Sequence, residues 1–389
     1  MRVLFAVSPG LDHLFPTVGL AWAFRTAGHE VAIATSGTSV DAAVRTGLPV
    51  WDVSPGADFD AIFPLVGTVE ERAKRMRERG RTVAQAGVTP DIILEKFGRV
   101  SDLMADGTLA FARAWQPELI VYSRLQGAAL LVARALGVPA VEHGFSFLRE
   151  GSMPQRFLPH LAPVYERLGV PVELPDVTSL YFAPEHLMYG EGTGWTMRSV
   201  PYHGGGAIPG WLVEPRQRPR ICVTLGTTVP HVAGVGSLGR VLQAAGDLDA
   251  EFVLALGDDP HLAPLGRLPD NCRVVDWTPL SLLLANCDAI VHHGGAGTTL
   301  ASAHAGVPQL AMPHGADNWI NADIVTRCGV GLNREPEEMT VDDLHALLGD
   351  PTIRKAAGAL AAELAAEPGP DQLVPRLVGL AETATRVRG

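Results

Sequence analysis

Short apolar runs alternate with longer segments of helical spacing along the first half of the chain. Apolar runs predict buried strands at residues 2–7 (RVLFAV), 31–36 (VAIATS), 117–123 (PELIVYS) and 139–144 (PAVEHG). Residues 16–30 (PTVGLAWAFRTAGHE) have the spacing of a helix, and Pro16 stands at a favoured first helical position, after a predicted loop over residues 8–15. Strands that are apolar throughout and joined by helices predict a parallel sheet covered on both faces.

The second half of the chain repeats this rhythm after a change in composition. Residues 201–219 (PYHGGGAIPGWLVEPRQRP) are rich in proline and glycine and predict a linker. Further strands are predicted at residues 220–227 (RICVTLGT), 251–256 (EFVLAL), 272–277 (CRVVDW) and 288–293 (DAIVHH). The predicted fold class is therefore α/β, with two doubly wound, Rossmann-like domains that face each other across a cleft. The predicted boundaries are 1–202 for the first domain, 203–219 for the linker and 220–389 for the second domain, whose last helix is a candidate to pack back on the first.

Composition excludes several classes of protein. The 389 residues exceed the usual size of a single core, which agrees with two domains. A net charge of −11 argues against general binding to nucleic acids or to anionic membrane surfaces. No apolar run approaches the length of a membrane span, and the four cysteines form no CxxC pair, so we expect free thiols in the cytoplasm. The sequence has no P-loop, no GxGxxG after the first strand, and no His/Cys spacing typical of a metal site.

The strongest chemical pattern lies in residues 291–318 (VHHGGAGTTLASAHAGVPQLAMPHGADN). A strand leads into a glycine-rich turn and then a helix. Gly294 and Gly295 let the backbone approach a ligand, and the helix N-terminus offers free N–H groups and partial positive charge that favour phosphate. His293 and the hydroxyl of Thr298 can donate to phosphate oxygens. The alternative is a plain strand-to-helix turn capped by Thr298.

Other polar groups fall at the carboxyl ends of neighbouring predicted strands, the edge at which open α/β sheets bind ligands. Asp317 and Asn318 suit sugar hydroxyls, although an Asx-type cap of the next helix would use the same residues. Trp277 offers an aromatic plane for a nucleobase, with core packing as the alternative. Gly226 and Thr227 end a strand that faces the same cleft.

These motifs resemble those of the GT-B family 1 glycosyltransferases, most of all the bacterial branch that attaches deoxysugars to macrolides and aromatic polyketides. The resemblance rests on HHGGAGT (292–298), AGVPQLAMPHGADN (305–318), NA (321–322) and DHLFPTVGLAWAFRTAGHEV (12–31). It implies an inverting, metal-independent O-glycosyltransferase of class EC 2.4, with no cofactor besides its nucleotide-sugar donor. Because deoxysugar users of this branch commonly take dTDP-sugars, dTDP is favoured over UDP.

The resemblance also assigns roles by position. It implies diphosphate binding by His293, Gly294 and Thr298, with Gly226 and Thr227 nearby, base stacking by Trp277, and sugar contacts by Asp317 and Asn318. His13 would be the catalytic base, and its place in the predicted first β-α loop agrees, because an imidazole accepts an alcohol proton near neutral pH. Many relatives carry an aspartate where this chain has Ser123, so Ser123, Asp12 or Glu142 would have to orient His13.

The acceptor is expected to be a bulky, hydrophobic aglycone held by the first domain. Its expected neighbours include residues 142–148 and residues 55–79, a segment predicted as a long irregular insertion. Phe59, Phe63 and Leu65 of this insertion could line the acceptor pocket, with core packing as the alternative.

Three other functions stay open at this stage. A C-glycosyltransferase would use the same base on a phenol. A nucleotide-sugar 2-epimerase would share the two-domain architecture and the diphosphate site. A non-catalytic partner would keep the fold without turnover. The expected partners are the nucleotide-sugar and the aglycone, without nucleic acid, and the sequence leaves open a homodimer and an auxiliary activator protein.

Overall fold

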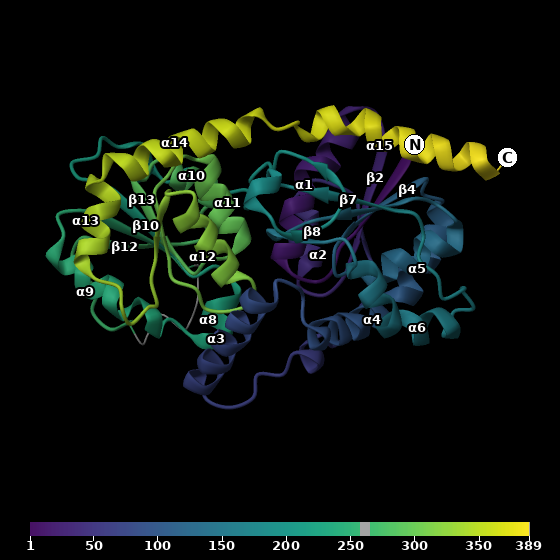
Figure 1. Cartoon of the computed structure of the whole chain (residues 1–389), viewed down its shortest axis with the longest axis horizontal. Helices are drawn as coiled ribbons and strands as arrows, with labels where there is room; N and C mark the ends of the chain where they lie inside the picture. Colours follow the sequence, from purple (N-terminus) through teal and green to yellow (C-terminus); the bar gives the residue numbers. More distant parts are fainter. Residues whose placement is uncertain (257–264, 389) are drawn as a thin grey trace. The chain divides into compact units, whose positions relative to one another are not determined.

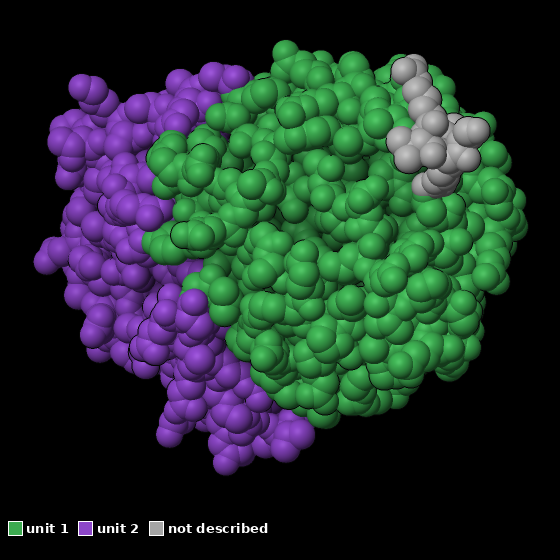
Figure 2. Space-filling model, turned by 45° about the vertical axis from the view of Figure 1, so that its right-hand side comes forward, with its two compact units in different colours: residues 1–64, 87–204, 367–389 green, residues 65–86, 205–366 purple. Residues whose placement is uncertain are grey.

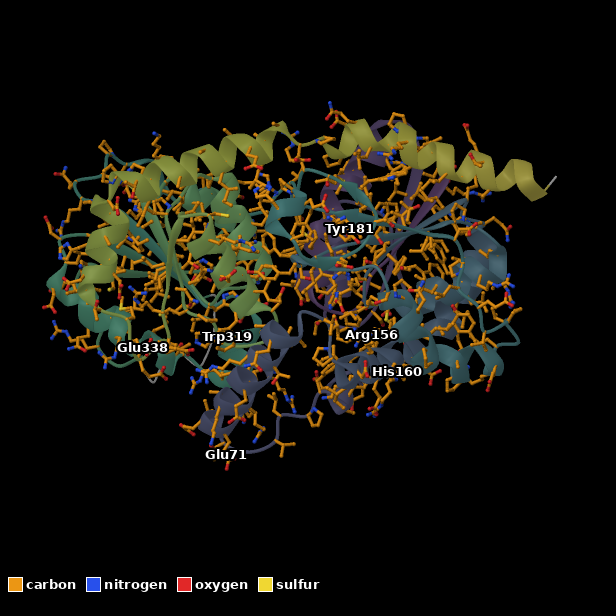
Figure 3. The ribbon with its side chains drawn as sticks, viewed as in Figure 1. Glu71, Arg156, His160, Tyr181, Trp319 and Glu338 are labelled. Atoms are coloured by element: carbon orange, nitrogen blue, oxygen red, sulfur yellow. The ribbon has the colours of Figure 1, made fainter. Side chains whose placement is uncertain are left out.

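The computed structural model describes residues 1–256 and 265–388, which form two compact units (Figures 1 and 2). Unit 1 comprises residues 1–64, 87–204 and 367–389, and unit 2 comprises residues 65–86 and 205–366. Each unit is built on its own parallel sheet. Figure 3 marks Tyr181 at the end of the unit 1 strand β7, and Trp319 in the unit 2 helix α12. The predicted α/β class with two sheets is confirmed.

The sheet of unit 1 has seven strands in the order β3-β2-β1-β4-β5-β7-β9, a doubly wound pattern. The strands are β1 (Arg2–Ala6), β2 (Glu30–Thr35), β3 (Val50–Asp52), β4 (Leu119–Ser123), β5 (Ala140–His143), β7 (Val177–Tyr181) and β9 (Trp195–Thr196), with a separate pair β6 (Leu148–Glu150) and β8 (Tyr189–Glu191). The helices are α1 (Leu11–Thr26), α2 (Ser39–Val44), α4 (Asp91–Trp115), α5 (Gly127–Leu136), α6 (Met153–Arg167) and α15 (Pro370–Arg388).

Both faces of this sheet are buried. Val3 and Phe5 of β1 belong to a core cluster with residues of α1 and α15. Leu4 and Ala6 of the same strand belong to a second cluster with residues of α4, α5 and α6. A strand covered on both sides has no solvent-facing positions, which explains why residues 2–7 form a continuous apolar run.

The sheet of unit 2 has six strands in the order β12-β11-β10-β13-β14-β15, all parallel. The strands are β10 (Arg220–Thr224), β11 (Glu251–Ala255), β12 (Cys272–Val275), β13 (Ala289–His292), β14 (Gln309–Ala311) and β15 (Gly331–Asn333). The helices are α3 (Val69–Ala86), α7 (Gly210–Val213), α8 (Thr228–Ala233), α9 (Gly239–Asp247), α10 (Leu280–Leu284), α11 (Ala296–His304), α12 (Asn318–Arg327), α13 (Val341–Gly349) and α14 (Pro351–Ala366). Ile221 and Val223 of β10 pack with α9 and α13, and Cys222 packs on the other face with α10 and α11.

The first helix begins earlier than the sequence predicts. It starts at Leu11 rather than at Pro16, so most of the predicted loop over residues 8–15 is helical. Gly10 precedes the helix with φ of 135°, a conformation that favours glycine, and the N–H of Leu14 already bonds to its carbonyl at 3.2 Å. Pro16 is tolerated one turn in, where its missing N–H removes a single helical bond. The prediction that His13 lies in a loop is therefore wrong, because it occupies the first turn of α1.

The predicted irregular insertion is also only partly irregular. Residues 60–62 form a short 3-10 turn, and α3 begins at Val69. The compact units differ from the predicted domains here, because residues 65–86 belong to unit 2. Residues 367–389, placed in the second predicted domain, belong to unit 1, where α15 buries Leu373 and Leu377 in the core beside α1. None of the helices described has the length and apolarity of a membrane span.

Candidate active site

In unit 1, His13 is held in an aromatic environment. Its side chain is buried, and its ring lies 4.6 Å from the ring of Phe145 and 5.3 Å from that of Phe97, measured between centroids. Burial lowers the pKa of His13, and the charge of the nearby Asp12 opposes part of this shift. The imidazole is therefore neutral at neutral pH and can accept a proton.

The orientation of His13 differs from the expected dyad. Its Nδ1 atom is buried and has no hydrogen-bond partner among the residues described. The Ser123 Oγ accepts the N–H of Ser8 at 3.1 Å, and no hydrogen bond joins Ser123 to the imidazole Nδ1 in the described part of the chain. Glu142 is also engaged elsewhere, 3.1 Å from Arg124. Of the three expected partners, Asp12 is the one that acts on His13, and it does so through its charge.

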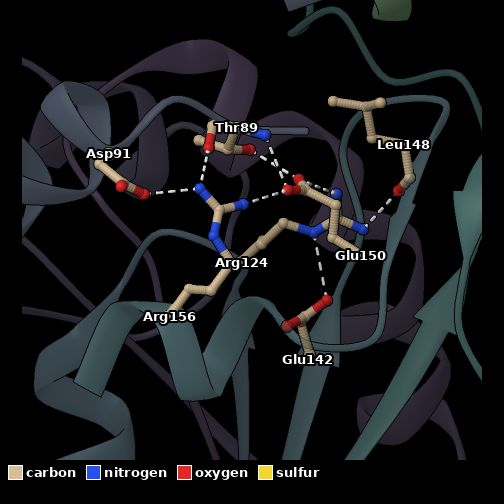
Figure 4. Close-up of polar contacts among 7 residues, drawn as sticks. All are labelled: Thr89, Asp91, Arg124, Glu142, Leu148, Glu150 and Arg156. Carbon is tan, nitrogen blue, oxygen red and sulfur yellow. Dashed lines mark hydrogen bonds and ion pairs between the residues drawn. The ribbon is translucent and has the colours of Figure 1, made fainter. Parts of the chain in front are cut away.

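An ionic cluster lies beyond the end of β4, close in sequence to Ser123 (Figure 4). The guanidinium of Arg124 is buried; it donates to Glu142 at 3.1 Å and to the Leu148 carbonyl at 2.7 Å, and it lies 3.7 Å from Glu150. Glu150 accepts the N–H and the hydroxyl of Thr89 at 2.7 and 2.6 Å, just before α4. The cluster therefore ties β4, β5 and β6 to the start of the helix that carries Phe97.

The residues of the predicted insertion are divided between the two units. Phe63 belongs to unit 1 and lies 5.6 Å from Phe97, with Lys96 over its ring at 4.9 Å. Phe59 packs against the main unit 1 core, and its ring would meet a side chain placed at Gly37. Leu65 is exposed and belongs to unit 2.

In unit 2, the two histidines of the glycine-rich turn have different roles. His292 is fully buried at the end of β13; its Nδ1 accepts the N–H of Gly294 at 3.1 Å, and its Nε2 lies 3.1 Å from the side-chain oxygen of Gln309. Burial lowers its pKa to about 4, although the bond to Gln309 opposes the shift. These contacts shape the turn and leave His292 no free ring nitrogen.

His293 lies between two glycines. A Cβ at Gly226, where φ is +66°, would come within 2.6 Å of the His293 ring, and a Cβ at Gly295 would overlap the same ring. Burial and the neighbouring His292 and His314 lower the pKa of His293 to about 3. A hydrogen bond with the Thr224 backbone opposes this shift. The imidazole is therefore neutral, with one N–H that can donate to the Thr224 carbonyl or to a ligand.

Helix α11 presents a free N-terminus beside this ring. Its N-cap residue is Gly295, which supplies no side-chain cap, and the first helical bond runs from Thr299 to the Gly295 carbonyl at 2.9 Å. The first three N–H groups of such a helix have no partner within it, and they suit an anion. Thr298 occupies the third helical position, so the alternative in which Thr298 caps the turn is wrong.

The loop before α12 is joined to the glycine-rich turn. Gly294, with φ of +82°, leaves no room for a side chain because a Cβ would lie 2.9 Å from the Asn318 carbonyl oxygen. The amide of Asn321 donates to the Gly294 carbonyl at 2.7 Å. The side-chain oxygen of Asn318 accepts the N–H groups of His314 and Gly315 at 3.3 and 2.9 Å, so it holds the loop. Asp317 stands at the N-cap position of α12 without a side-chain cap bond, so the Asx-cap alternative is not realised there.

Trp277 and Thr227 lie at the carboxyl ends of other strands in the same sheet. Trp277 follows β12 and is 46% exposed, which argues against the alternative of core packing. Thr227 is exposed at the N-cap position of α8, directly after Gly226. Because β12, β11, β10, β13 and β14 are parallel neighbours, all the predicted donor-site residues follow the carboxyl ends of strands on the same side of the unit 2 sheet.

Comparison with known families agrees with this geometry. The models of the erythromycin biosynthesis protein CIII-like family match residues 22–226 with the N-terminal domain and residues 239–380 with the C-terminal domain. The chain belongs to this family. It is a natural-product glycosyltransferase of class EC 2.4 with the GT-B fold, as the resemblance implied.

Individual relatives of this glycosyltransferase match almost its whole length. The elloramycin glycosyltransferase ElmGT of Streptomyces olivaceus is 38% identical, with 97% of each chain covered. The crystal structure of the glycosyltransferase SnogD from Streptomyces nogalater is similar with a TM-score of 0.85 at 38% identity, covering 98% of this chain and 99% of that one. The Streptomyces sp. SF2575 glycosyltransferase SsfS6, solved in complex with thymidine diphosphate, has a TM-score of 0.79 at 29% identity, covering 97% and 99%.

Several residues that build the glycosyltransferase site are absent from the sequence-based predictions. Gln309, His314 and Asn321 fix the turn and the loop from within, and each is buried. The pair NA at 321–322 was a usable signal for Asn321. Phe97 carries no motif, and only the fold places it beside His13, whereas Phe145 lies within residues 142–148, the segment expected near the acceptor.

Proposed function

We propose that this glycosyltransferase transfers a deoxysugar from a dTDP-linked donor to a hydroxyl of a hydrophobic aglycone, with inversion at the anomeric carbon. The observation that supports the proposal most directly is the position of the His293 ring between Gly226 and Gly295, beside the free N-terminus of α11. We call the His293 ring and this helix N-terminus the diphosphate seat. Neutral N–H donors gathered at one helix end suit a diphosphate. The solved complex of SsfS6 with thymidine diphosphate supports thymine as the base.

In the proposed reaction, His13 accepts the proton of the acceptor hydroxyl while that oxygen attacks the anomeric carbon from the face opposite the diphosphate. The bond from the anomeric carbon to the diphosphate oxygen breaks, and the diphosphate leaves with both electrons. The charge that develops on it is stabilised by the N–H groups of α11 and by neutral His293. We propose that these donors suffice without a metal ion or further cofactor.

The remaining assignments follow the same edge of the unit 2 sheet. Exposed Trp277 stacks on the base, and Asp317 contacts the sugar hydroxyls. In unit 1, the rings of Phe63, Phe97 and Phe145 supply an apolar wall around the base His13, which supports a hydrophobic acceptor.

The proposal is tested by a transfer assay with TDP-rhamnose and a panel of polycyclic phenols and macrolactones, with and without EDTA. We expect an O-linked product with the anomeric configuration opposite to that of the donor, at an EDTA-independent rate. Mass spectrometry detects the product, and NMR gives its linkage and configuration. A C-linked product, an epimerised sugar without acceptor, or nucleotide binding without turnover on any acceptor would each favour one of the three other functions.

A further inference from the structure

Helix α3 occupies an unusual place in the fold. Its sequence lies between β3 and α4, two elements of unit 1, but the helix packs in unit 2 against α8 and α12 (Figure 1). Its partly buried Met76 joins the unit 2 core cluster. The chain therefore leaves unit 1, contributes one helix to unit 2, and returns.

The backbone of α3 lies directly against the loop that precedes α12. A Cβ at Gly80 would overlap the ring of Trp319 and lie 2.9 Å from the Gly315 Cα. On the other side of the contact, a Cβ at Gly315 would overlap the side chain of Met76. The two glycines thus let the ring of Trp319 and the side chain of Met76 pack directly against backbone.

Polar contacts fasten the helix at both ends of this interface. Arg72 donates to the Val232 carbonyl in α8 at 2.8 Å. Arg81 lies with its guanidinium 5.6 Å from the ring centre of Trp319 and pairs with Glu335 at 2.8 Å. Figure 3 marks Trp319 within this region.

The elements that α3 contacts carry predicted donor-site residues. Helix α8 begins directly after Gly226 and Thr227, and the loop between Gly315 and Trp319 contains Asp317 and Asn318. The glycine-rich turn is also fixed from within the sheet, because the N–H of Gly294 bonds to His292 at 3.1 Å and His292 lies 3.1 Å from Gln309. A displacement of α3 would therefore move the sugar-binding loop more than the diphosphate seat.

We propose that α3 is a positioning element for the donor sugar. Its Gly80 face fixes the position of residues 315–319, which run from the loop into the first turn of α12, and therefore the position of Asp317. This inference rests on the proposed function, in which Asp317 contacts the sugar. It assigns to residues 69–86, which lie outside the motifs that predict the donor site, a part in the recognition of the sugar rather than of the nucleotide.

The experiment compares the affinities of variants for TDP and for TDP-rhamnose by calorimetry, together with KM for TDP-rhamnose. Alanine favours a helix over glycine, so Gly80→Ala should strengthen α3 itself and act only through its new methyl group. We expect the affinity for TDP to change less than about 2-fold, while that for TDP-rhamnose falls roughly 10-fold or more, as displaced positioning groups do. Gly358→Ala in α14, where a Cβ meets nothing within 4 Å, is the matched control.

A second pair of variants covers the case in which Gly80→Ala does not fold. Arg81→Gln removes the contacts with Glu335 and Trp319, and Arg79→Gln changes an exposed residue on the same helix. We expect a smaller, sugar-dependent loss for the first and no loss for the second. Equal losses for TDP and TDP-rhamnose, or none in either Gly80→Ala or Arg81→Gln, would overturn the inference but leave the proposed function in place. A wild-type protein that binds neither ligand would overturn both.

Discussion

The candidate sites of the two units bury their polar groups in different ways. In unit 1 the buried groups include full charges: Arg124 lies between Glu142 and Glu150, while the nearby base, His13, has an unpartnered Nδ1. In unit 2 the buried groups of the site are neutral histidines and amides, tied to one another over short distances. A buried charge depends on its partner, whereas a buried neutral group depends on single hydrogen bonds.

This difference matches the tasks proposed for each unit. A general base must gain and lose a proton. The described residues offer Nδ1 of His13 no hydrogen-bond partner that would fix one protonation state. A diphosphate seat must stay neutral and donate, and the low pKa values of His292, His293 and His314 keep it so. The comparison predicts that substitutions at the unit 1 site lower turnover, whereas substitutions at the unit 2 site lower the affinity for the nucleotide.

The largest expected effect is that of His13→Ala on turnover. Loss of the general base should lower kcat by about 10²–10⁴-fold, because proton transfer contributes factors of that size. The affinity for TDP, which the proposal assigns to unit 2, should not change. Steady-state kinetics measures kcat, and calorimetry on the same preparation measures the affinity for TDP. A variant that keeps wild-type kcat would remove His13 from the mechanism.

Arg124→Met should have the next largest effect, on stability. Removing the guanidinium leaves buried Glu142 without a cation and Glu150 with Arg156 alone, which costs about 3–5 kcal/mol of unfolding free energy. Urea denaturation measures the loss. Arg167→Gln is the control, because its pairs with Asp102 and Asp106 are exposed and should contribute less than about 1 kcal/mol. Similar losses for the two variants would show that burial of the Arg124 cluster has no special energetic weight.

Gly295→Ala should weaken TDP binding by displacing His293 and by keeping the ligand from the backbone at the N-cap of α11. The added methyl group overlaps the imidazole and must displace it, although φ at this residue suits alanine. Loss of a hydrogen bond to a charged group predicts about 10- to 100-fold lower affinity. Gly246→Ala, at a position with nothing within 4 Å, should bind TDP like the wild type. Calorimetry with TDP compares the two, and equal affinities would argue that His293 does not contact the diphosphate.

The smallest expected change for a single substitution concerns the pH dependence of stability, to which buried histidines of both units contribute. Folding lowers the pKa of His292 and His314 to about 4 and of His293 to about 3, from an unfolded value near 6.5. As pH falls below about 6.5, these histidines take up protons in the unfolded chain but stay neutral in the folded chain. Their contribution to the free energy of unfolding is therefore present above that pH and lost below it. Each histidine removes up to ~1.4 kcal/mol per pH unit. Urea titrations at pH 7 and pH 5.5 should show this slope, and His292→Gln should reduce it; an unchanged slope in that variant would be inconsistent with a buried, neutral His292.

The same contrast explains what the sequence could predict. The predicted donor site comes mostly from one contiguous motif, residues 291–321, and only Gly226, Thr227 and Trp277 follow other strands. The sheets were predictable because continuous apolar runs mark strands buried on both faces. The sequence could not predict that residues 65–86 belong to unit 2, because a helix of mixed charge gives no sign of which unit it joins.

The acceptor side shows the limit most clearly. His13, Phe97 and Phe145 come from separate segments, and only tertiary packing brings their rings together. No motif indicates that the Ser123 Oγ accepts the backbone N–H of Ser8, which follows β1, or that Nδ1 of His13 has no partner among the described residues.

The most direct test of the account is a calorimetric titration of TDP into the wild type, His293→Ala and His13→Ala. The account predicts micromolar binding by the wild type and by His13→Ala, and at least about 10-fold weaker binding by His293→Ala, since only the last loses a donor to the diphosphate. Equal binding by all three proteins, or none by the folded wild type, would contradict the assignment of the nucleotide to residues 291–318 of unit 2.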